Sequence, residues 1–199
     1  MNSIKEFFKG APLTAGFCFA CIAVFVAEVI TSGSVISPLG NRGEGIGWHM
    51  VFDPGFVRAY DQWYRVFSAT FVHLDIGHLL LNLLMIALVG REVERAYGWV
   101  VILALIIACS IGGALFVWWM QPLSAVGGAS TFGYGLFAML LLLSSARGQG
   151  LAGPAVLLGV NLMYSVMLTS VSLWGHIGGL VGGAVVALAL RVRGVGPRS

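Results

Sequence analysis

Four polar side chains in otherwise apolar segments have the types that acyl-transfer chemistry needs: Ser130, His176, His78 and Asn82. A serine hydroxyl becomes a nucleophile when a base takes its proton, and a neutral imidazole is the usual base near pH 7. Ser130 and His176 can supply this pair. His78 and Asn82 lie four residues apart on one helical face, so both can donate hydrogen bonds to an oxyanion.

A third catalytic partner is harder to find. All eight acidic residues lie at or before Glu94, and none adjoins Ser130 or His176 in sequence. A carboxylate must therefore come from a distant segment, with Glu28 and Asp75 as candidates. We favour a Ser-His dyad in which Tyr134, one turn after Ser130, stacks on the imidazole. Because Ser130 starts a predicted helix, its backbone N–H lacks an intrahelical partner and is a further oxyanion donor.

The composition places these residues in a membrane. The chain has 199 residues, of which 58% are hydrophobic and 10% charged, and its mean hydropathy is +0.93. Soluble domains are roughly 45–50% apolar and about 25% charged. An ordinary cytosolic enzyme, a disordered chain and a disulfide scaffold are therefore excluded. The 11 Lys and Arg form no basic stripe, which argues against nucleic-acid binding.

The uncharged stretches predict the helices. Arg95 and Arg147 enclose 51 residues without a formal charge, and Arg147 and Arg191 enclose another 43. A spanning helix needs about 20 residues, so each stretch holds two crossings, divided at 121–124 and at 169–172. We predict an all-α polytopic membrane protein, a six-transmembrane-helix bundle in one domain over 1–199. Its spans are at about 13–30, 71–89, 100–120, 128–145, 151–168 and 173–190, with a long loop at about 31–70.

The basic residues predict the orientation. Eight of the 11 Lys and Arg lie on the side of the two termini and three lie opposite. The positive-inside rule therefore makes both termini cytoplasmic and the 31–70 loop non-cytoplasmic. Trp63, Tyr64 and Phe67 suit an interfacial loop, in which Arg65 is expected to act as an anchor. The short form indicates a multi-pass protein of a prokaryotic cell (inner) membrane.

Helical rise predicts that the polar groups converge in depth. Counted from the arginine that ends each span, His78 lies about 20 Å away, His176 about 22 Å and Ser130 about 26 Å. Three different helices thus bring polar groups to similar heights. We expect Glu28 to reach water at the outer end of its span, and His73 and Asp75 to lie at the membrane surface as anchors.

No cofactor is expected. The cysteines Cys18, Cys21 and Cys109 lie inside predicted spans, where they act as small apolar residues and make neither a disulfide nor a zinc site. The sequence contains no metal, nucleotide or haem motif.

At residues 62–190 the pattern resembles the rhomboid family of intramembrane serine proteases. Trp63-Tyr64-Arg65 is similar to the family's WR motif, and His73, His78 and Asn82 to its second span. Glu94 to Gly98 is similar to its acidic-to-glycine turn. The nucleophile motif has its counterpart in Gly128, Ala129, Ser130 and Tyr134, and the last span in His176, Gly179 and Gly183.

The resemblance implies that Ser130 is the nucleophile and His176 the general base and acid. It implies an oxyanion hole made by His78, Asn82 and the Ser130 N–H. The implied partners are the lipid bilayer and single-pass or multi-pass membrane-protein substrates, cut in or near their transmembrane helices, and not nucleic acid. One position departs from the family pattern: Thr131 stands where glycine usually follows the serine, which bears on helix packing and on the substrate pocket.

Two other functions compete with the protease. A catalytically inactive rhomboid-like protein would bind transmembrane helices without cutting them, and Thr131 is the feature in its favour. A small-solute channel or transporter would use His78, Asn82 and His176 as a polar path, but no internal repeat is visible. Gly179 and Gly183 are expected to serve helix packing in either case.

Overall fold

The computed structural model describes residues 2–40, 43–167 and 171–198. Within these ranges the chain is helical, and one isolated β-bridge, Phe52 with Val126, stands in place of a sheet. Residues 169 and 170 of the division predicted at 169–172 lie outside the described residues, and Ser172 caps α11. The helices, with one isolated bridge and no sheet among the described residues, confirm the all-α class.

Among the described residues, four helical runs are long and apolar enough to cross a membrane. They are α2 (Pro12–Ser32), the continuous run of α6 (Ile76–Met85), η2 (Ile86–Gly90) and α7 (Arg91–Tyr97), α8 (Trp99–Met120) and α11 (Leu173–Val192). Two apolar helices are shorter, α9 (Ser130–Ala146) with 17 residues and α10 (Ala152–Met167) with 16. At about 1.5 Å per residue, α9 is shorter than a hydrocarbon core of about 30 Å, so by its length it crosses only part of such a core.

The second predicted span begins later than expected. Residues 71–75 are the end of a 3-10 turn followed by extended chain, and α6 begins at Ile76. The carboxylate of Asp75 accepts a hydrogen bond from the backbone N–H of His78 at 2.9 Å and so caps the helix. An N-cap of this kind starts a helix at a defined residue, which hydropathy alone does not reveal.

Helix α1 (Asn2–Phe7) precedes α2. In its described residues, the segment between α2 and α6 contains four short helices. They are α3 (Ile46–Met50), α4 (Pro54–Tyr60), α5 (Arg65–Ser68) and η1 (Ala69–Phe71). Arg65 is 2% exposed, and its guanidinium donates to the backbone oxygens of Trp48 at 2.7 Å and Val51 at 2.9 Å. Its predicted role as an anchor of this segment is confirmed.

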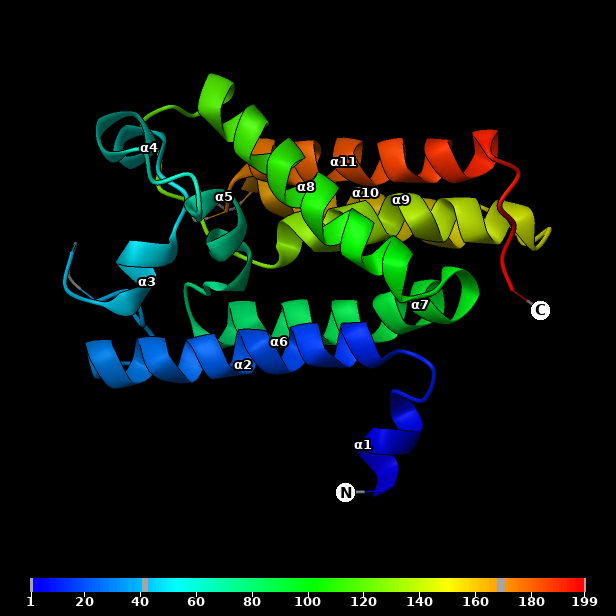
Figure 1. Cartoon of the computed structure of the whole chain (residues 1–199), viewed down its shortest axis with the longest axis horizontal. Coiled ribbons are helices and arrows are strands. Elements are labelled where there is room, and N and C mark those ends of the chain that lie inside the picture. The colour runs from blue at the N-terminus through cyan, green and yellow to red at the C-terminus, as the bar shows by residue number, and fades with distance from the viewer. Residues whose placement is uncertain (1, 41–42, 168–170, 199) are drawn as a thin grey trace.

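Helix α11 packs along both α8 and α9 in the middle of the molecule, while α2 and α6 lie side by side below them (Figure 1). The helices α3, α4 and α5 gather at one end. The other end carries α7 and the C-terminus, and α1 extends from there below α2, with the N-terminus under the bundle. This arrangement brings the start of α9 and the start of α11 to the same part of the molecule.

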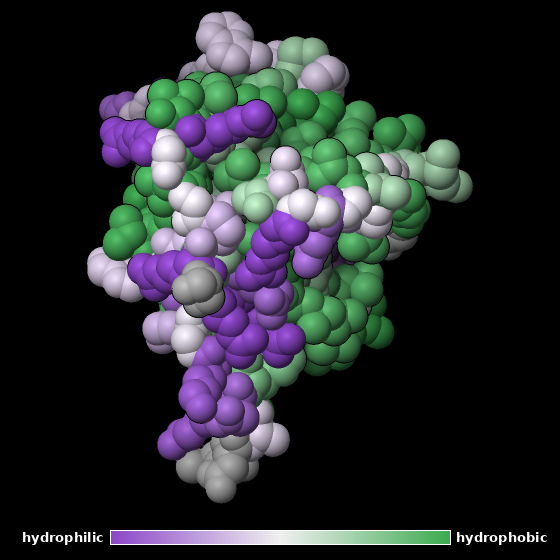
Figure 2. All heavy atoms as spheres, turned by 90° about the vertical axis from the view of Figure 1, so that its right-hand side faces the viewer, coloured by the Kyte–Doolittle hydropathy of each residue, from purple (hydrophilic) through white to green (hydrophobic). Residues whose placement is uncertain are grey.

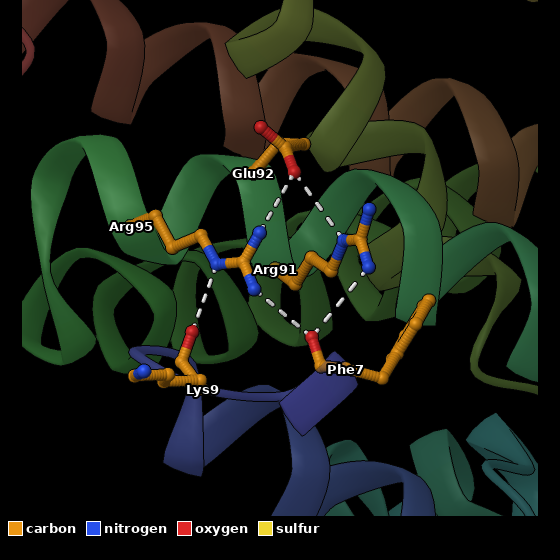
Figure 3. A network of polar contacts seen from close by, with 5 residues as sticks. All are labelled: Phe7, Lys9, Arg91, Glu92 and Arg95. Atoms are coloured by element: carbon orange, nitrogen blue, oxygen red, sulfur yellow. Dashed lines mark hydrogen bonds and ion pairs between the residues drawn. The ribbon is translucent and has the colours of Figure 1, made fainter. Parts of the chain in front are cut away.

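Polar contacts hold the N-terminal segment on α7. The guanidinium of Arg95 donates to the backbone oxygen of Lys9 at 2.9 Å and to that of Phe7 at 3.0 Å, and Glu92 lies between Arg91 and Arg95 (Figure 3). The first turn of α2 is held by Glu94, whose buried carboxylate accepts a hydrogen bond from the backbone N–H of Thr14 at 2.7 Å. A carboxylate at a helix N-terminus satisfies free N–H groups and favours the helix dipole.

Candidate active site

Ser130 is the first residue of α9, and the chain before it is held by backbone hydrogen bonds. Val126 and Phe52 exchange two N–H···O bonds of 2.9 Å, and the N–H of Gly128 donates to Ala69 at 2.9 Å. Gly128 has a φ of +146°, and a Cβ there would lie 2.8 Å from His78 Cε1. Glycine is therefore required at this position both by the backbone conformation and by the approach of His78.

His176 reaches Ser130 from α11. Its Nε2 lies 2.8 Å from the Oγ of Ser130, and the residue is 6% exposed. The ring of Tyr134 stacks on the imidazole with 4.3 Å between centroids and 16° between planes. The nucleophile and base positions predicted from the sequence thus lie within hydrogen-bonding distance, and the stacking residue comes from the same helix as the serine.

The other imidazole nitrogen meets a residue that the sequence reasoning missed. Nδ1 of His176 lies 2.7 Å from the Oγ of Ser165 on α10, and the same Oγ lies 2.8 Å from the Tyr134 hydroxyl. The signal available in the sequence was the pair Asn161 and Ser165, two polar residues four apart in an apolar stretch. Nothing in the sequence distinguishes that helix face from any other.

The two carboxylates considered as third partners lie elsewhere. Asp75 caps α6. Glu28 was expected to reach water but is fully buried, accepting from the backbone N–H of His73 at 3.3 Å. Gly47 of α3 packs on this carboxylate, since a Cβ there would lie 2.8 Å from Oε1. The expectation about Glu28 was wrong because the segment between α2 and α6 folds over the end of its helix.

His73 is also buried rather than at the surface, which corrects a second expectation. Its Nδ1 lies 3.0 Å from the backbone oxygen of Phe71, and its ring lies 5.3 Å from that of His78. Burial, with a smaller contribution from His78, lowers the pKa of His73 to about 3. A neutral His73 therefore supports the chain that leads into α6.

His78 lies near Ser130, whereas Asn82 is directed to the backbone. The Nδ1 of His78 accepts from the N–H of Leu74 at 3.4 Å, so its Nε2 carries the hydrogen, and this nitrogen lies on the Gly128 side of the ring. The amide of Asn82 donates to the backbone oxygen of His78 at 3.0 Å. Of the two predicted oxyanion donors, His78 thus lines the same cavity as Ser130, and Asn82 does not.

A small cavity of about 60 Å³ joins these groups. Ser130, His176, His78 and Thr131 contribute to its wall, together with Ser110 of α8. Because a water molecule occupies about 30 Å³ of liquid volume, this space suits a few waters beside the serine. Hydrolysis of an acyl-serine needs such water.

Thr131 is accommodated by a glycine on the neighbouring helix. A Cβ built on Gly113 of α8 would overlap the Cγ2 methyl group of Thr131. The side chain that replaces the usual glycine therefore occupies the space that Gly113 leaves open. Thr131 also borders the cavity, so it shapes the space next to Ser130 without separating α9 from α8.

The geometry agrees with the comparisons to known proteins. The family model described as the Rhomboid domain matches residues 60–193. The chain belongs to the rhomboid family, a family of intramembrane proteases. With its four long apolar helices it is an integral membrane protein.

Individual relatives share modest identity with the chain. It is 31% identical over 136 residues to Rhomboid protease GluP of Bacillus subtilis, a match that covers 66% of this chain and 27% of that protein. It is 25% identical over 189 residues to Rhomboid protease GlpG of Yersinia pestis, covering 90% and 63%. It is 22% identical over 199 residues to RHOMBOID-like protein 1 of Arabidopsis thaliana, covering 96% and 50%. The chain therefore spans between about a quarter and two thirds of the length of these relatives.

Proposed function

We propose that this chain is an intramembrane serine endopeptidase that hydrolyses peptide bonds in or near transmembrane helices of membrane proteins. The observation that carries the proposal is the 2.8 Å approach of His176 Nε2 to Ser130 Oγ beside a cavity with room for water. Family membership, the burial of His176 and the partial burial of Ser130 support it. The substrates are membrane proteins that reach the site through the bilayer.

The reaction uses the two residues in turn. His176 Nε2 takes the proton of the Ser130 hydroxyl as Oγ attacks the substrate carbonyl, which forms a tetrahedral oxyanion. When this intermediate collapses, the imidazolium gives its proton to the leaving amine, and Ser130 carries the acyl group. A water from the cavity then attacks the ester with His176 again acting as base, which frees the acid and restores Ser130.

Stabilisation of the oxyanion falls to donors beside Ser130. The Nε2–H of His78 on α6 and the backbone N–H of Ser130 in the first turn of α9 are available. The family motif adds Asn82 to this set, and we assign it to positioning His78, because its amide donates to the backbone oxygen of His78. Three glycines let the residues of the site approach one another: Gly128, Gly179 and Gly183. Tyr134 supports the site by stacking on the imidazole of His176. Each donor is worth roughly 2.7–4 kcal/mol in known oxyanion holes.

The same proposal includes the orientation of a single six-helix domain. Both termini lie on the cytoplasmic side of a prokaryotic cell (inner) membrane, and the segment with α3, α4 and α5 lies on the other side.

Variants of the two reacting residues test the activity. Wild type, Ser130→Ala and His176→Ala, reconstituted in liposomes, are incubated with a single-pass substrate whose helix contains small residues and with a fluorophosphonate serine label. We expect either substitution to lower cleavage at least about 1,000-fold, since acyl transfer depends on both groups together. Labelling should be absent in Ser130→Ala and slowed in His176→Ala.

Ser144→Ala is the matched control, because Ser144 is a buried serine on the same helix and does not line the cavity. It should cleave and label like wild type. Cleavage that persists in Ser130→Ala, or a wild type that neither cleaves nor labels, contradicts the protease and favours an inactive helix-binding protein.

A further inference from the structure

The imidazole of His176 needs an orienting partner at Nδ1. A neutral imidazole carries one hydrogen, and it can accept the Ser130 proton at Nε2 only when that hydrogen is on Nδ1. In serine proteases with a triad, a carboxylate sets this tautomer. Here the polar atom that faces Nδ1 is the Oγ of Ser165, at 2.7 Å.

The hydrogen-bond capacity of Ser165 decides which way the bond runs. A hydroxyl has one hydrogen to donate and two lone pairs to accept with. The Oγ of Ser165 lies 2.9 Å from the backbone oxygen of Asn161, one turn earlier in α10. A carbonyl oxygen can only accept, so this contact takes the single hydrogen of Ser165. Both lone pairs of Oγ are then left for other donors.

Two donors face these lone pairs. The hydroxyl of Tyr134 lies 2.8 Å from Ser165 Oγ and donates to it, and Nδ1–H of His176 donates to the same atom. Every hydrogen-bonding position of the Ser165 hydroxyl is then filled. The opposite arrangement, with Ser165 donating to Nδ1, would give up the bond to Asn161 and lower the number of hydrogen bonds made by this buried hydroxyl from three to two.

We propose that Ser165 is a positioning residue that holds His176 in the Nδ1–H tautomer, with its lone pair at Nε2 directed to Ser130. In its catalytic consequence this inference rests on the proposed protease function. When the Ser130 proton moves to Nε2, the positive imidazolium keeps its Nδ1–H bond to Ser165. No proton passes to Ser165; its oxygen dipole, aligned by the Asn161 carbonyl, faces the charge where a triad would have a carboxylate.

The tautomer of His176 also depends on the packing of α10. Among the side chains of α10 that the structure describes, Ser165 is the one that is buried, at 3% exposed. The tautomer is therefore set only while α10 lies against α9 and α11. A substrate helix that displaces α10 would release His176 from this contact until the helix returns.

Nitrogen-15 NMR of histidine-labelled protein in liposomes tests the tautomer directly, because protonated and bare imidazole nitrogens have well-separated shifts. The chain has four histidines, so the His176 signals are those lost in His176→Ala. We expect wild type to show hydrogen on Nδ1 of His176, and Ser165→Ala to show a mixture of tautomers. Hydrogen on Nε2 in wild type overturns the proposal.

Kinetics provide the second measurement. We expect Ser165→Ala to lower kcat about 10- to 100-fold with little change in KM, less than the roughly 10,000-fold effect of losing a triad carboxylate. Ser165→Thr keeps the hydroxyl and the bond to the preceding turn, and should recover most of kcat. Tyr134→Phe removes the hydroxyl that bonds to Ser165 but keeps the stacked ring and the bond between Ser165 and His176, and should lose less kcat than Ser165→Ala.

The two measurements separate this inference from the protease itself. If wild type cleaves and Ser165→Ala matches it in kcat and in the NMR spectrum, Ser165 has no positioning role while the protease stands. If wild type does not cleave, the protease fails, and the tautomer in wild type still decides the role of Ser165. Equal losses of kcat in Ser165→Ala and Ser165→Thr would point to packing alone and contradict the proposal.

Discussion

At the scale of single residues, His78 and Asn82 differ in role, although the sequence predicts both as donors to the oxyanion. Asp75 caps α6, Leu74 donates to Nδ1 of His78, and Asn82 holds the backbone oxygen of His78. These contacts orient the ring with Nε2–H as its free donor. Asn82 is therefore expected to act on the oxyanion through the position of His78 rather than by direct contact.

A double-mutant cycle distinguishes direct from indirect action. We expect His78→Ala to lower kcat about 100- to 1,000-fold, the cost of one oxyanion donor. Asn82→Ala should lower it less. The double variant should lose little more than His78→Ala alone, since contacting residues couple. Independent donation by Asn82 would instead multiply the two losses. Cleavage of the single-pass substrate in liposomes, at equal amounts of folded protein, provides the measurement.

At the scale of helices, α11 brings His176 to Ser130 because two of its faces lack side chains. Gly178 and Gly182 lie on the backbone of α8, and Gly179 and Gly183 lie on the backbone of α9, where any Cβ would overlap the facing carbonyl oxygens. Small residues at this spacing let helices in lipid pack backbone to backbone. The distance between Ser130 and His176 thus depends on glycines that take no part in the chemistry.

Gly179→Ala tests this dependence. Its methyl group would meet the carbonyl of Thr131, next to Ser130, so α11 must move away from α9. We expect a lower thermal midpoint and a loss of kcat of at least about 10-fold, because small misplacements in an active site cost about 100-fold.

Gly159→Ala is the control for helical glycine, since nothing lies within 4 Å of the added Cβ on α10. It should match wild type or be slightly more stable, because alanine favours a helix over glycine. Retained activity and stability in Gly179→Ala would show that the close contact of α11 with α9 is not required.

At the scale of the whole molecule, polar residues gather at the end that carries α1, α7 and the C-terminus. Figure 2 looks onto this end and shows hydrophilic side chains gathered there beside apolar ones. Arg91 and Arg95 lie there with Glu92, bound to the N-terminal segment (Figure 3). The basic excess that predicts a cytoplasmic side is therefore collected at one face of the folded chain.

Cysteine accessibility tests that orientation. The native cysteines are buried and unpaired, at most 7% exposed, so background labelling should be low. A membrane-impermeant maleimide should label Ala59→Cys on α4 in intact cells. It should label Val195→Cys, beyond α11, only after the membrane is permeabilised. The reverse pattern would overturn the proposed orientation, and wild type serves as the unlabelled control.

Much of the site could be predicted from the sequence because lipid constrains a chain strongly along its length. Uncharged stretches mark the helices, the basic residues mark a side, and polar groups in apolar helices are costly enough to indicate function. From these rules the sequence predicts Ser130, His176 and His78 as site residues and Tyr134 as the side chain that stacks on the imidazole. They also placed Arg65 as an anchor.

What only the tertiary structure decided is which face of each helix meets which neighbour. Hydropathy determines that a segment lies in the bilayer but not its rotation, so Ser165 opposite His176 and Gly113 opposite Thr131 were invisible in the sequence. The folded segment over Glu28 and His73 was missed for a related reason, since its polar contacts join residues up to 45 positions apart. The reacting residues are local in the sequence, whereas the contacts that orient them depend on how separate helices pack.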